Sequence, residues 1–225
     1  MFPYMIDKEN TGIYRLAFDY ALKAFASKNP VEMARNSGSD FDSERSIISL
    51  QSLGQGIDVH FPDGHISFSD STLSPVWYWR FIILHYLSRA DNAPLFHRFI
   101  SYRELESGET FYPAFLRESI KPLADLIIRE TAERVKLACH KLGDCLDDRA
   151  DVSAVFFLLP RFPVRVNIWS GDEEIEASAN ILFDLSANHY LHTEDIAAAG
   201  HIVSSFLIKQ CELMAQANTG GICVQ

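Results

Sequence analysis

Residues 74–87 read SPVWYWRFIILHYL, and this stretch decides the fold because it predicts a helix that is apolar on nearly every side. Ser74 and Pro75 are typical of a helix cap followed by a first-turn proline, so we expect the helix to begin here and to end near Leu87. A helix without a polar face is normally covered by other elements. We therefore expect this helix to be central in the core.

Strand-like segments lie on both sides of this helix. Apolar runs, alternating patterns and the hairpin signal Asp63-Gly64 predict them. The predicted strands span residues 46–53, 57–61, 65–68, 99–102, 152–159, 164–169 and 181–184. The patterns do not decide whether the strands before the helix and those after it form one sheet.

Helical periodicity predicts further helices in four places. They span residues 11–27, 30–38, 112–142 and 193–217. In the first of them the apolar stripe expected to face the core contains Ile13, Leu16, Ala17, Tyr20 and Ala24. Residues 143–151, which read GDCLDDRAD, are predicted to form an exposed loop.

The order of these elements indicates the fold class. Strands and helices come in blocks rather than in strict alternation, which favours the α+β class with mainly antiparallel sheets. We expect these sheets to pack around the central apolar helix and the long flanking helices. The chain contains no evident linker or repeat, so we expect a single domain over residues 1–216 and a flexible tail over residues 217–225.

The chain has 225 residues and a formal net charge of −10, which disfavours binding to nucleic acid or to an anionic membrane. No apolar run reaches the roughly 20 residues of a membrane span, so we expect no membrane insertion. The first ten residues lack the basic and apolar regions of a secretory signal, and the four cysteines show no C-x-x-C spacing. These features predict a cytoplasmic protein with reduced thiols.

The sequence contains no P-loop, H-E-x-x-H or G-x-S-x-G motif, so no catalytic class is indicated. His85 lies on the apolar helix, where a buried imidazole is suited to ligate a haem or corrinoid, or to bond a neighbour in the core. Arg103 follows a predicted strand and is suited to bind a carboxylate or phosphate, or to pair with one of the many acids of the fold.

Acidic residues gather in the C-terminal third. Between Arg165 and Lys209 there is no lysine or arginine, and seven acids occur there. Asp172 and Glu174 follow a predicted strand that ends at Trp169, and this run is typical either of a cation site or of a solvated turn. The segment from Asp184 to Asp195 also contains His189, His192 and Glu194. Its residue types suit a metal site, whereas its two last acids also suit the first turn of a helix.

The ordered segments LHYL (residues 84–87), ISYREL (100–105), WSGDEE (169–174), ILFD (181–184) and YLHTED (190–195) resemble an uncharacterised prokaryotic family, domain of unknown function thirty-seven eighty-six. The resemblance covers about residues 12–210. It implies an anaerobic setting, in which some members carry an added four-cysteine iron–sulfur module that this chain lacks. It also implies that the family pattern falls on Arg103, Trp169, Asp172, Glu174, Asp184, Glu194 and Asp195, and not on His189 or His192.

Three hypotheses follow. The first is a non-catalytic cofactor-binding or accessory protein that handles a corrinoid or other tetrapyrrole, with His85, Arg103 and Trp169 as cofactor-binding residues. The second is an enzyme that uses a divalent cation such as Mg²⁺ or Mn²⁺. Its expected ligands are Asp172, Glu174, Asp184 and Glu194. The third is a module that binds a partner protein through an exposed apolar patch.

Overall fold

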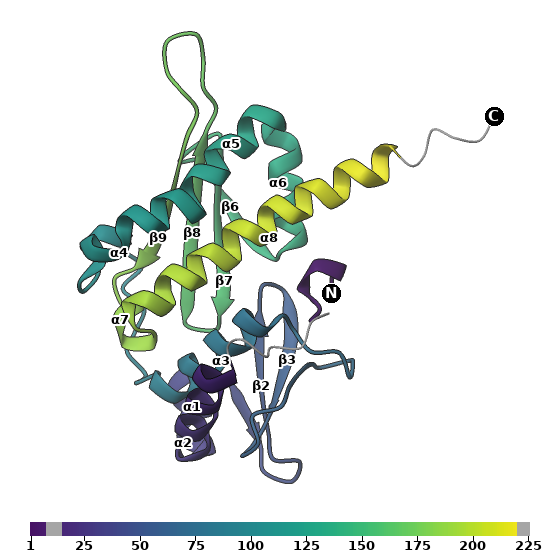
Figure 1. Ribbon diagram of the computed structural model, residues 1–225, viewed down its shortest axis with the longest axis vertical. Coiled ribbons are helices and arrows are strands. Elements are labelled where there is room, and N and C mark those ends of the chain that lie inside the picture. The colour runs from purple at the N-terminus through teal and green to yellow at the C-terminus, as the bar shows by residue number, and fades with distance from the viewer. Residues whose placement is uncertain (8–14, 220–225) are drawn as a thin grey trace, which may run out of the picture.

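The computed structural model describes residues 1–7 and 15–219, and it contains two separate antiparallel sheets (Figure 1). The smaller sheet has the strand order β1-β2-β3-β4, and the larger has the order β5-β9-β8-β7-β6. The smaller comprises β1 (Asp40–Asp42), β2 (Ile47–Ser52), β3 (Gln55–His60) and β4 (Ile66–Phe68). The larger comprises β5 (Phe99–Ser101), β6 (Asp144–Asp147), β7 (Val152–Leu159), β8 (Phe162–Trp169) and β9 (Ser178–Asp184). The predicted α+β class is confirmed.

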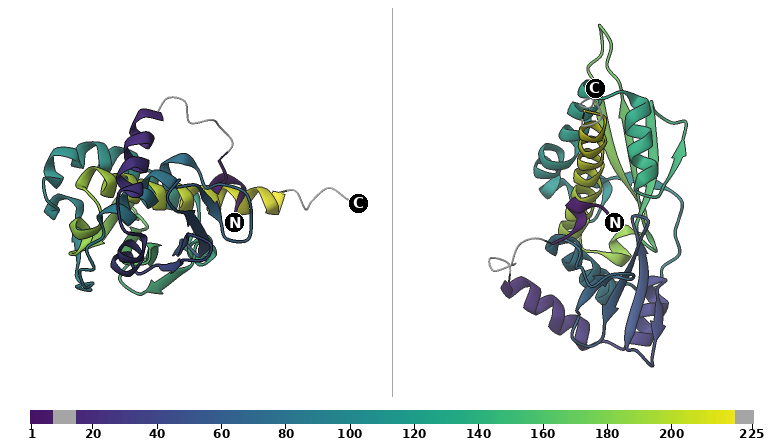
Figure 2. Two further views of the ribbon diagram at one scale, coloured as in Figure 1. Left: turned by 90° about the horizontal axis from the view of Figure 1, so that it is seen from below. Right: turned by 90° about the vertical axis from the view of Figure 1, so that its right-hand side faces the viewer.

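Helices pack on one face of the larger sheet (Figure 2). They are α4 (Gly108–Phe115), the π-helical turn η4 (Leu116–Ile120), α5 (Lys121–Arg129), α6 (Ala132–Lys141) and the long α8 (Thr193–Thr219). Side chains alternate between the two faces of a strand, so Val164, Val166 and Ile168 of β8 share the face that these helices cover. All three are fully buried.

The smaller sheet is accompanied by α1 (Arg15–Ala26), α2 (Pro30–Ser37) and the short 3₁₀ turn η1 (Pro3–Met5). The ends of α2 follow from its sequence. Asn29 caps it by accepting hydrogen bonds from the backbone N–H groups of Val31 and Glu32, and Gly38 ends it in the left-handed region at φ 73°.

The expected central helix is α3 (Trp77–Arg89), which contacts α1, α2 and α8 and lies between the two sheets. It also links them through one hydrogen-bonded chain. The indole of Trp79 donates to the hydroxyl of Ser52, which in turn donates to the carbonyl of Leu158 on the larger sheet. The predicted cap is wrong, because the residue before the helix is Val76 and no side chain caps this end.

Two sequence predictions fail in the fold. In α1 the described part of the expected core stripe faces solvent, since Leu16 is 69% and Tyr20 65% exposed, while Ala21 and Phe25 are buried. Ile13 of that stripe lies outside the described residues. Both faces of this helix carry apolar residues, so periodicity alone did not identify the buried one. Residues 144–147 are a strand rather than a loop, because they pair with β7 at the edge of the larger sheet.

Within the described residues, no helix combines the length and the apolar character needed to cross a bilayer. The predicted tail begins inside the observed helix, since α8 extends to Thr219. Residues 220–225 of that predicted tail lie outside the described part of the chain.

Candidate functional site

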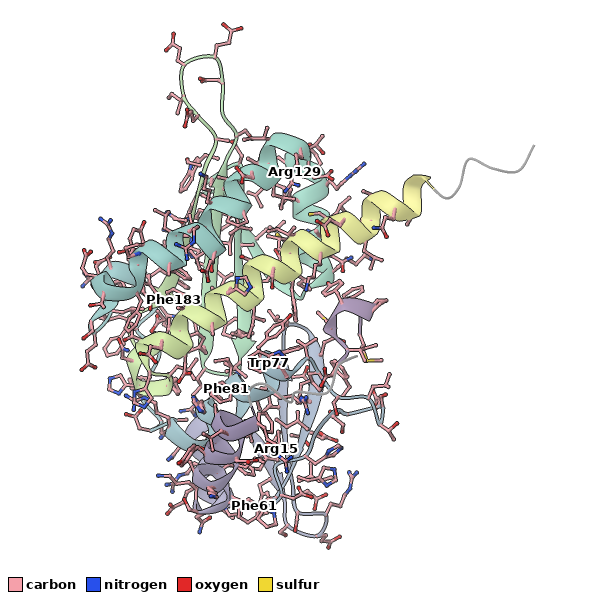
Figure 3. All side chains as sticks on the ribbon, viewed as in Figure 1. Arg15, Phe61, Trp77, Phe81, Arg129 and Phe183 are labelled. Atoms are coloured by element: carbon pink, nitrogen blue, oxygen red, sulfur yellow. The ribbon has the colours of Figure 1, made fainter. Side chains whose placement is uncertain are left out.

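 A groove runs along the N-terminal half of α8, between α4 and the beginning of α3. The cavity of this groove measures 610 Å³. Its walls carry the aromatic rings of Trp77, Tyr78, Phe111 and Phe115, and its floor includes Ala197, Ala198 and His201. We call this cavity the α8 groove. Figure 3 labels Trp77 on α3, the helix that forms one wall.

A glycine in α8 sets the position of one wall. A Cβ atom on Gly200 would lie 2.7 Å from Cε2 and 2.8 Å from Cζ of the Phe115 ring. These distances are shorter than van der Waals contact, so the bare backbone of Gly200 is what lets Phe115 lie directly on the helix. The ring also stacks on Tyr102, with 4.5 Å between the centroids, which holds it in place.

His201 is the titratable side chain on the floor of the α8 groove. Its Nδ1 lies 3.1 Å from the carbonyl oxygen of Glu118. A carbonyl oxygen only accepts hydrogen bonds, so Nδ1 donates, and in the neutral ring the lone pair is then on Nε2. Histidines that ligate metals commonly have their other nitrogen fixed in this way.

Two smaller polar cavities adjoin the groove at the beginning of α8, beside the short helix α7 (Ala187–Tyr190). They measure 420 Å³ and 370 Å³ and share Arg89, Glu106 and Asn188. The larger of the two also shares Phe111 and Glu194 with the α8 groove, so the three cavities form one continuous surface.

The guanidinium of Arg89 organises the polar end of this surface. Its Nη2 donates to the carbonyl oxygen of Asn188 at 3.0 Å, and its Nη1 lies 3.2 Å from Nε2 of His192. Close by, Nδ1 of His189 lies 2.8 Å from a carboxylate oxygen of Asp91. Burial acts to raise the pKa of Asp91, but hydrogen bonds from His189 and from the backbone N–H of Ala93, together with the charge of His189, outweigh it, so the pKa is lowered.

His85 lies one helical turn before Arg89 on α3. Its Nδ1 is 2.8 Å from a carboxylate oxygen of Asp195, and its ring packs on Phe81 with 4.1 Å between the centroids. The structure therefore brings His85, Asp195, His192 and His189 to the same end of α8, although they come from segments about 100 residues apart.

A family model described as "Domain of unknown function (DUF3786)" matches residues 29–205, which is well over half of the chain. The chain belongs to this family. Comparisons with curated proteins and with solved structures found no match.

In this DUF3786 chain the four carboxylates predicted to bind a metal are not brought together. Asp172 accepts hydrogen bonds from the backbone of Glu174 and Ile175 in the hairpin between β8 and β9, and these bonds lower its pKa. Asp184 is buried at the other end of β9, and a strand of this length spans roughly 20 Å.

The two oxygens of Asp184 differ, since its buried Oδ2 has no hydrogen-bond partner within the described residues. One oxygen of Asp184 accepts hydrogen bonds from the backbone of Phe96 and from the backbone and hydroxyl of Ser186. Glu194 lies on the rim of the α8 groove. Within residues 1–7 and 15–219, no three His, Cys, Asp or Glu side chains are grouped so that they could hold a metal ion.

The three residues predicted to bind a cofactor also lie apart in the DUF3786 fold. Arg103 stacks over Tyr112 at 4.0 Å and lies 3.9 Å from Glu109, so it pairs within the fold. Trp169 is at the hairpin end of β8, opposite Ser178. His85 of α3 contacts Asp195 in the first turn of α8. In Figure 1 this end of α8 lies beside α7, at the opposite end of the larger sheet from the β8–β9 hairpin, so these three side chains do not form one site.

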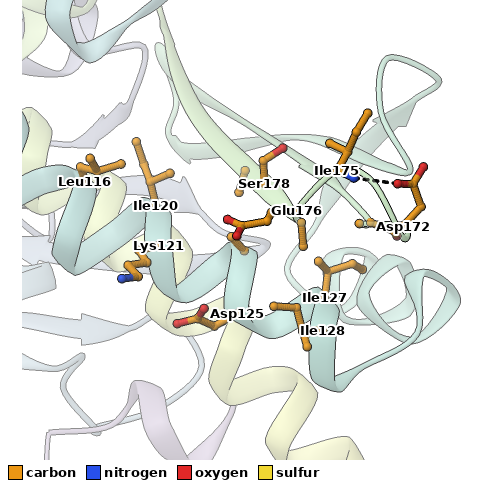
Figure 4. Close-up of a pocket in the computed structure, with 15 residues that line it drawn as sticks. Leu116, Ile120, Lys121, Asp125, Ile127, Ile128, Asp172, Ile175, Glu176 and Ser178 are labelled. Carbon is orange, nitrogen blue, oxygen red and sulfur yellow. Dashed lines mark hydrogen bonds between the residues drawn. The ribbon is translucent and has the colours of Figure 1, made fainter.

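Another cavity measures 910 Å³ and is lined by both apolar and charged residues (Figure 4). It lies between the helical segment η4–α5 and the β8–β9 hairpin, with Leu116, Ile120 and Ile128 on the helical side and Ile175 on the hairpin. Ile128 is 71% and Ile175 is 68% exposed, which is unusual for isoleucine. We call this cavity the hairpin groove.

Sequence reasoning missed His201 and both grooves. The run AAAGH at residues 197–201 gives α8 a stripe of small residues, which is a local signal for close packing or a groove floor. The aromatic walls come from α3 and α4, which lie more than 80 positions away in the chain. No pattern within a short stretch of sequence predicts that these walls and His201 come together.

Proposed function

We propose that the protein is a non-catalytic binding or accessory protein of anaerobic metabolism that holds a flat conjugated cofactor, a corrinoid or other tetrapyrrole, in the α8 groove. The observation that carries this proposal is the aromatic-walled groove with the His201 imidazole on its floor. Such a cofactor supplies a metal centre with an open axial position.

The residues of the groove fit this class of ligand. A floor of alanines leaves room for a flat ring, and the rings of Trp77, Tyr78 and Phe111 offer apolar surfaces for stacking. The lone pair of His201 Nε2 suits an axial ligand. Lys209 in the groove and Arg89 in the adjoining cavity are suited to pair with the carboxylates that tetrapyrroles carry at their rims.

This assignment makes His201 rather than His85 the first candidate for the axial ligand. His85 also has its Nδ1 fixed by a hydrogen bond, here to Asp195, but it does not line the α8 groove. We therefore assign His85 a positioning role, in which it holds the beginning of α8 against α3.

The test is an absorption spectrum with native mass spectrometry of protein purified without air, followed by titration with haemin and with hydroxocobalamin. We expect saturable binding and a shifted visible band with at least one probe. His201→Ala should weaken binding at least about tenfold, because it removes the axial bond. His65→Ala, at an exposed histidine of the smaller sheet, is the matched control.

Two results contradict the proposal. One is the absence of saturable binding to either probe by protein whose far-ultraviolet circular dichroism shows that it is folded. The other is binding that His201→Ala and His65→Ala leave equally intact, since it would place the probe outside the α8 groove.

The hairpin groove supports a second candidate function, the binding of a partner protein. Its exposed isoleucines suit an apolar segment, and Asp125, Asp172 and Glu176 at its margin favour basic residues beside that segment. We expect a fluorescent peptide of leucines flanked by lysines to bind with saturation. Ile128→Asp should abolish that binding, whereas Leu137→Asp, at an exposed leucine of α6, should not.

A further inference from the structure

A cationic cavity lies on the face of the larger sheet that points away from α8. It measures 360 Å³ and is lined by Arg98, Arg149 and Arg165, together with His97 and Asn167. Arg165 alternates along β8 with Val164 and Val166, which face the helices, so this cavity and the α8 groove lie on opposite sides of the sheet. Three arginines converge here although the protein carries a net charge of −10.

Arg165 is held in a fixed position at the base of this cavity. Its side chain is only 9% exposed, and its guanidinium lies over the ring of Phe99 at 4.5 Å. Its Nη1 donates to Asp147 at 2.6 Å, whereas its buried Nε has no hydrogen-bond partner within the described residues. A buried charged donor without a partner is costly, so the guanidinium of Arg165 is incompletely paired at the base of this cavity.

Positively charged side chains outnumber negatively charged ones at this cavity. Asp147 accepts from both Arg165 and Arg149, at 2.6 Å and 3.2 Å. Asp147 thus pairs with two guanidinium groups, and Arg98, whose charge acts on Glu104, brings a third from the connector before β5. The excess positive charge favours an anion with several oxygen acceptors.

We propose that this cavity binds a small-molecule oxyanion, either a phosphate or a dicarboxylate, with Arg165 as the fixed base and Arg98 and Arg149 as the two exposed arms. Asn167 adds a polar group at the floor, where its side-chain oxygen accepts a hydrogen bond from Ser153 at 2.6 Å. A volume of 360 Å³ admits an organic group beside the anionic head.

The test is isothermal titration calorimetry of the full chain with inorganic phosphate and with succinate, at an ionic strength held constant with chloride. We expect saturable binding of at least one anion, and the tighter of the two identifies the ligand class. Arg98→Ala and Arg149→Ala should each weaken that binding about tenfold. Arg117→Ala, at an exposed arginine that pairs with Glu118, should leave it unchanged.

The proposal is overturned if neither anion gives saturable heat, or if the Arg98→Ala and Arg149→Ala variants bind as tightly as the unaltered protein. His201→Ala should not change anion binding, because the α8 groove lies on the other side of the sheet. This variant therefore separates a failure of the anion site from a failure of the cofactor proposal.

Discussion

The Nδ1 atom of His85 lies 2.8 Å from a carboxylate oxygen of Asp195, and this contact joins the central helix α3 to the first turn of α8. A carboxylate only accepts hydrogen bonds, so Nδ1 donates. Asp195 is buried and lies where the helix dipole favours a negative charge. The pair therefore fixes the end of α8 at which the three adjoining cavities meet.

Removing either partner should destabilise the fold. We expect Asp195→Ala and His85→Ala each to lower the free energy of unfolding by about 1–3 kcal/mol, because each leaves a partly buried polar group without its partner. Urea denaturation of both single variants and the double variant measures the coupling. A coupling near zero would show that the contact does not stabilise the fold.

Gly200→Ala should destabilise the protein by about 1–3 kcal/mol, because the added Cβ would lie 2.7 Å from the Phe115 ring. Helix propensity alone predicts the opposite sign, since alanine is favoured over glycine by about 1 kcal/mol. The control is Ala198→Gly, on the groove floor of the same helix. Its change in the free energy of unfolding, from thermal or chemical denaturation, gives the contribution of helix propensity. A stabilised Gly200→Ala variant would mean that Phe115 does not pack against this position.

Asp147→Asn should destabilise the protein at pH 7 by about 1–3 kcal/mol and much less in acid. Burial acts to raise the pKa of Asp147, but hydrogen bonds from Ser153 and Arg149 and the charge of Arg165 lower it below its ordinary value of 3.8. A lowered pKa stabilises the fold above pH 3.8 and loses this effect as the pH falls through the folded-state pKa. Urea denaturation at pH 7 and pH 3, with Asp148→Asn as control, measures the difference.

The thiols should differ in reactivity. Burial raises the pKa of Cys211 to about 12 and that of Cys139 well above its ordinary value, whereas Cys145 is exposed on β6. Since the thiolate is the reactive form, we expect Cys145 to react with dithionitrobenzoate at least about tenfold faster than the other two. Cys223 lies outside the described residues, so the measurement uses a Cys223→Ser background. Equal rates for all three thiols would contradict the observed burial.

Much of the fold was predictable because its signals are local. Asn29 and Gly38 mark the ends of α2, and Asp63-Gly64 marks the hairpin between β3 and β4. The buried run in residues 74–87 identified α3. The prediction failed where local patterns were ambiguous, as in α1, whose two faces are both apolar, and in β6, whose acids resemble those of a loop.

The sequence by itself determined the α+β class, most strands and helices, and the family to which the chain belongs, because these depend on residue order and on periodicity over a few turns. Only the tertiary structure decided which side chains meet. It separated Asp172 from Asp184, placed His201 beneath the aromatic walls of the α8 groove, and gathered Arg98, Arg149 and Arg165 on the opposite side of the sheet. Such meetings depend on packing between segments far apart in the chain, and no local pattern encodes them.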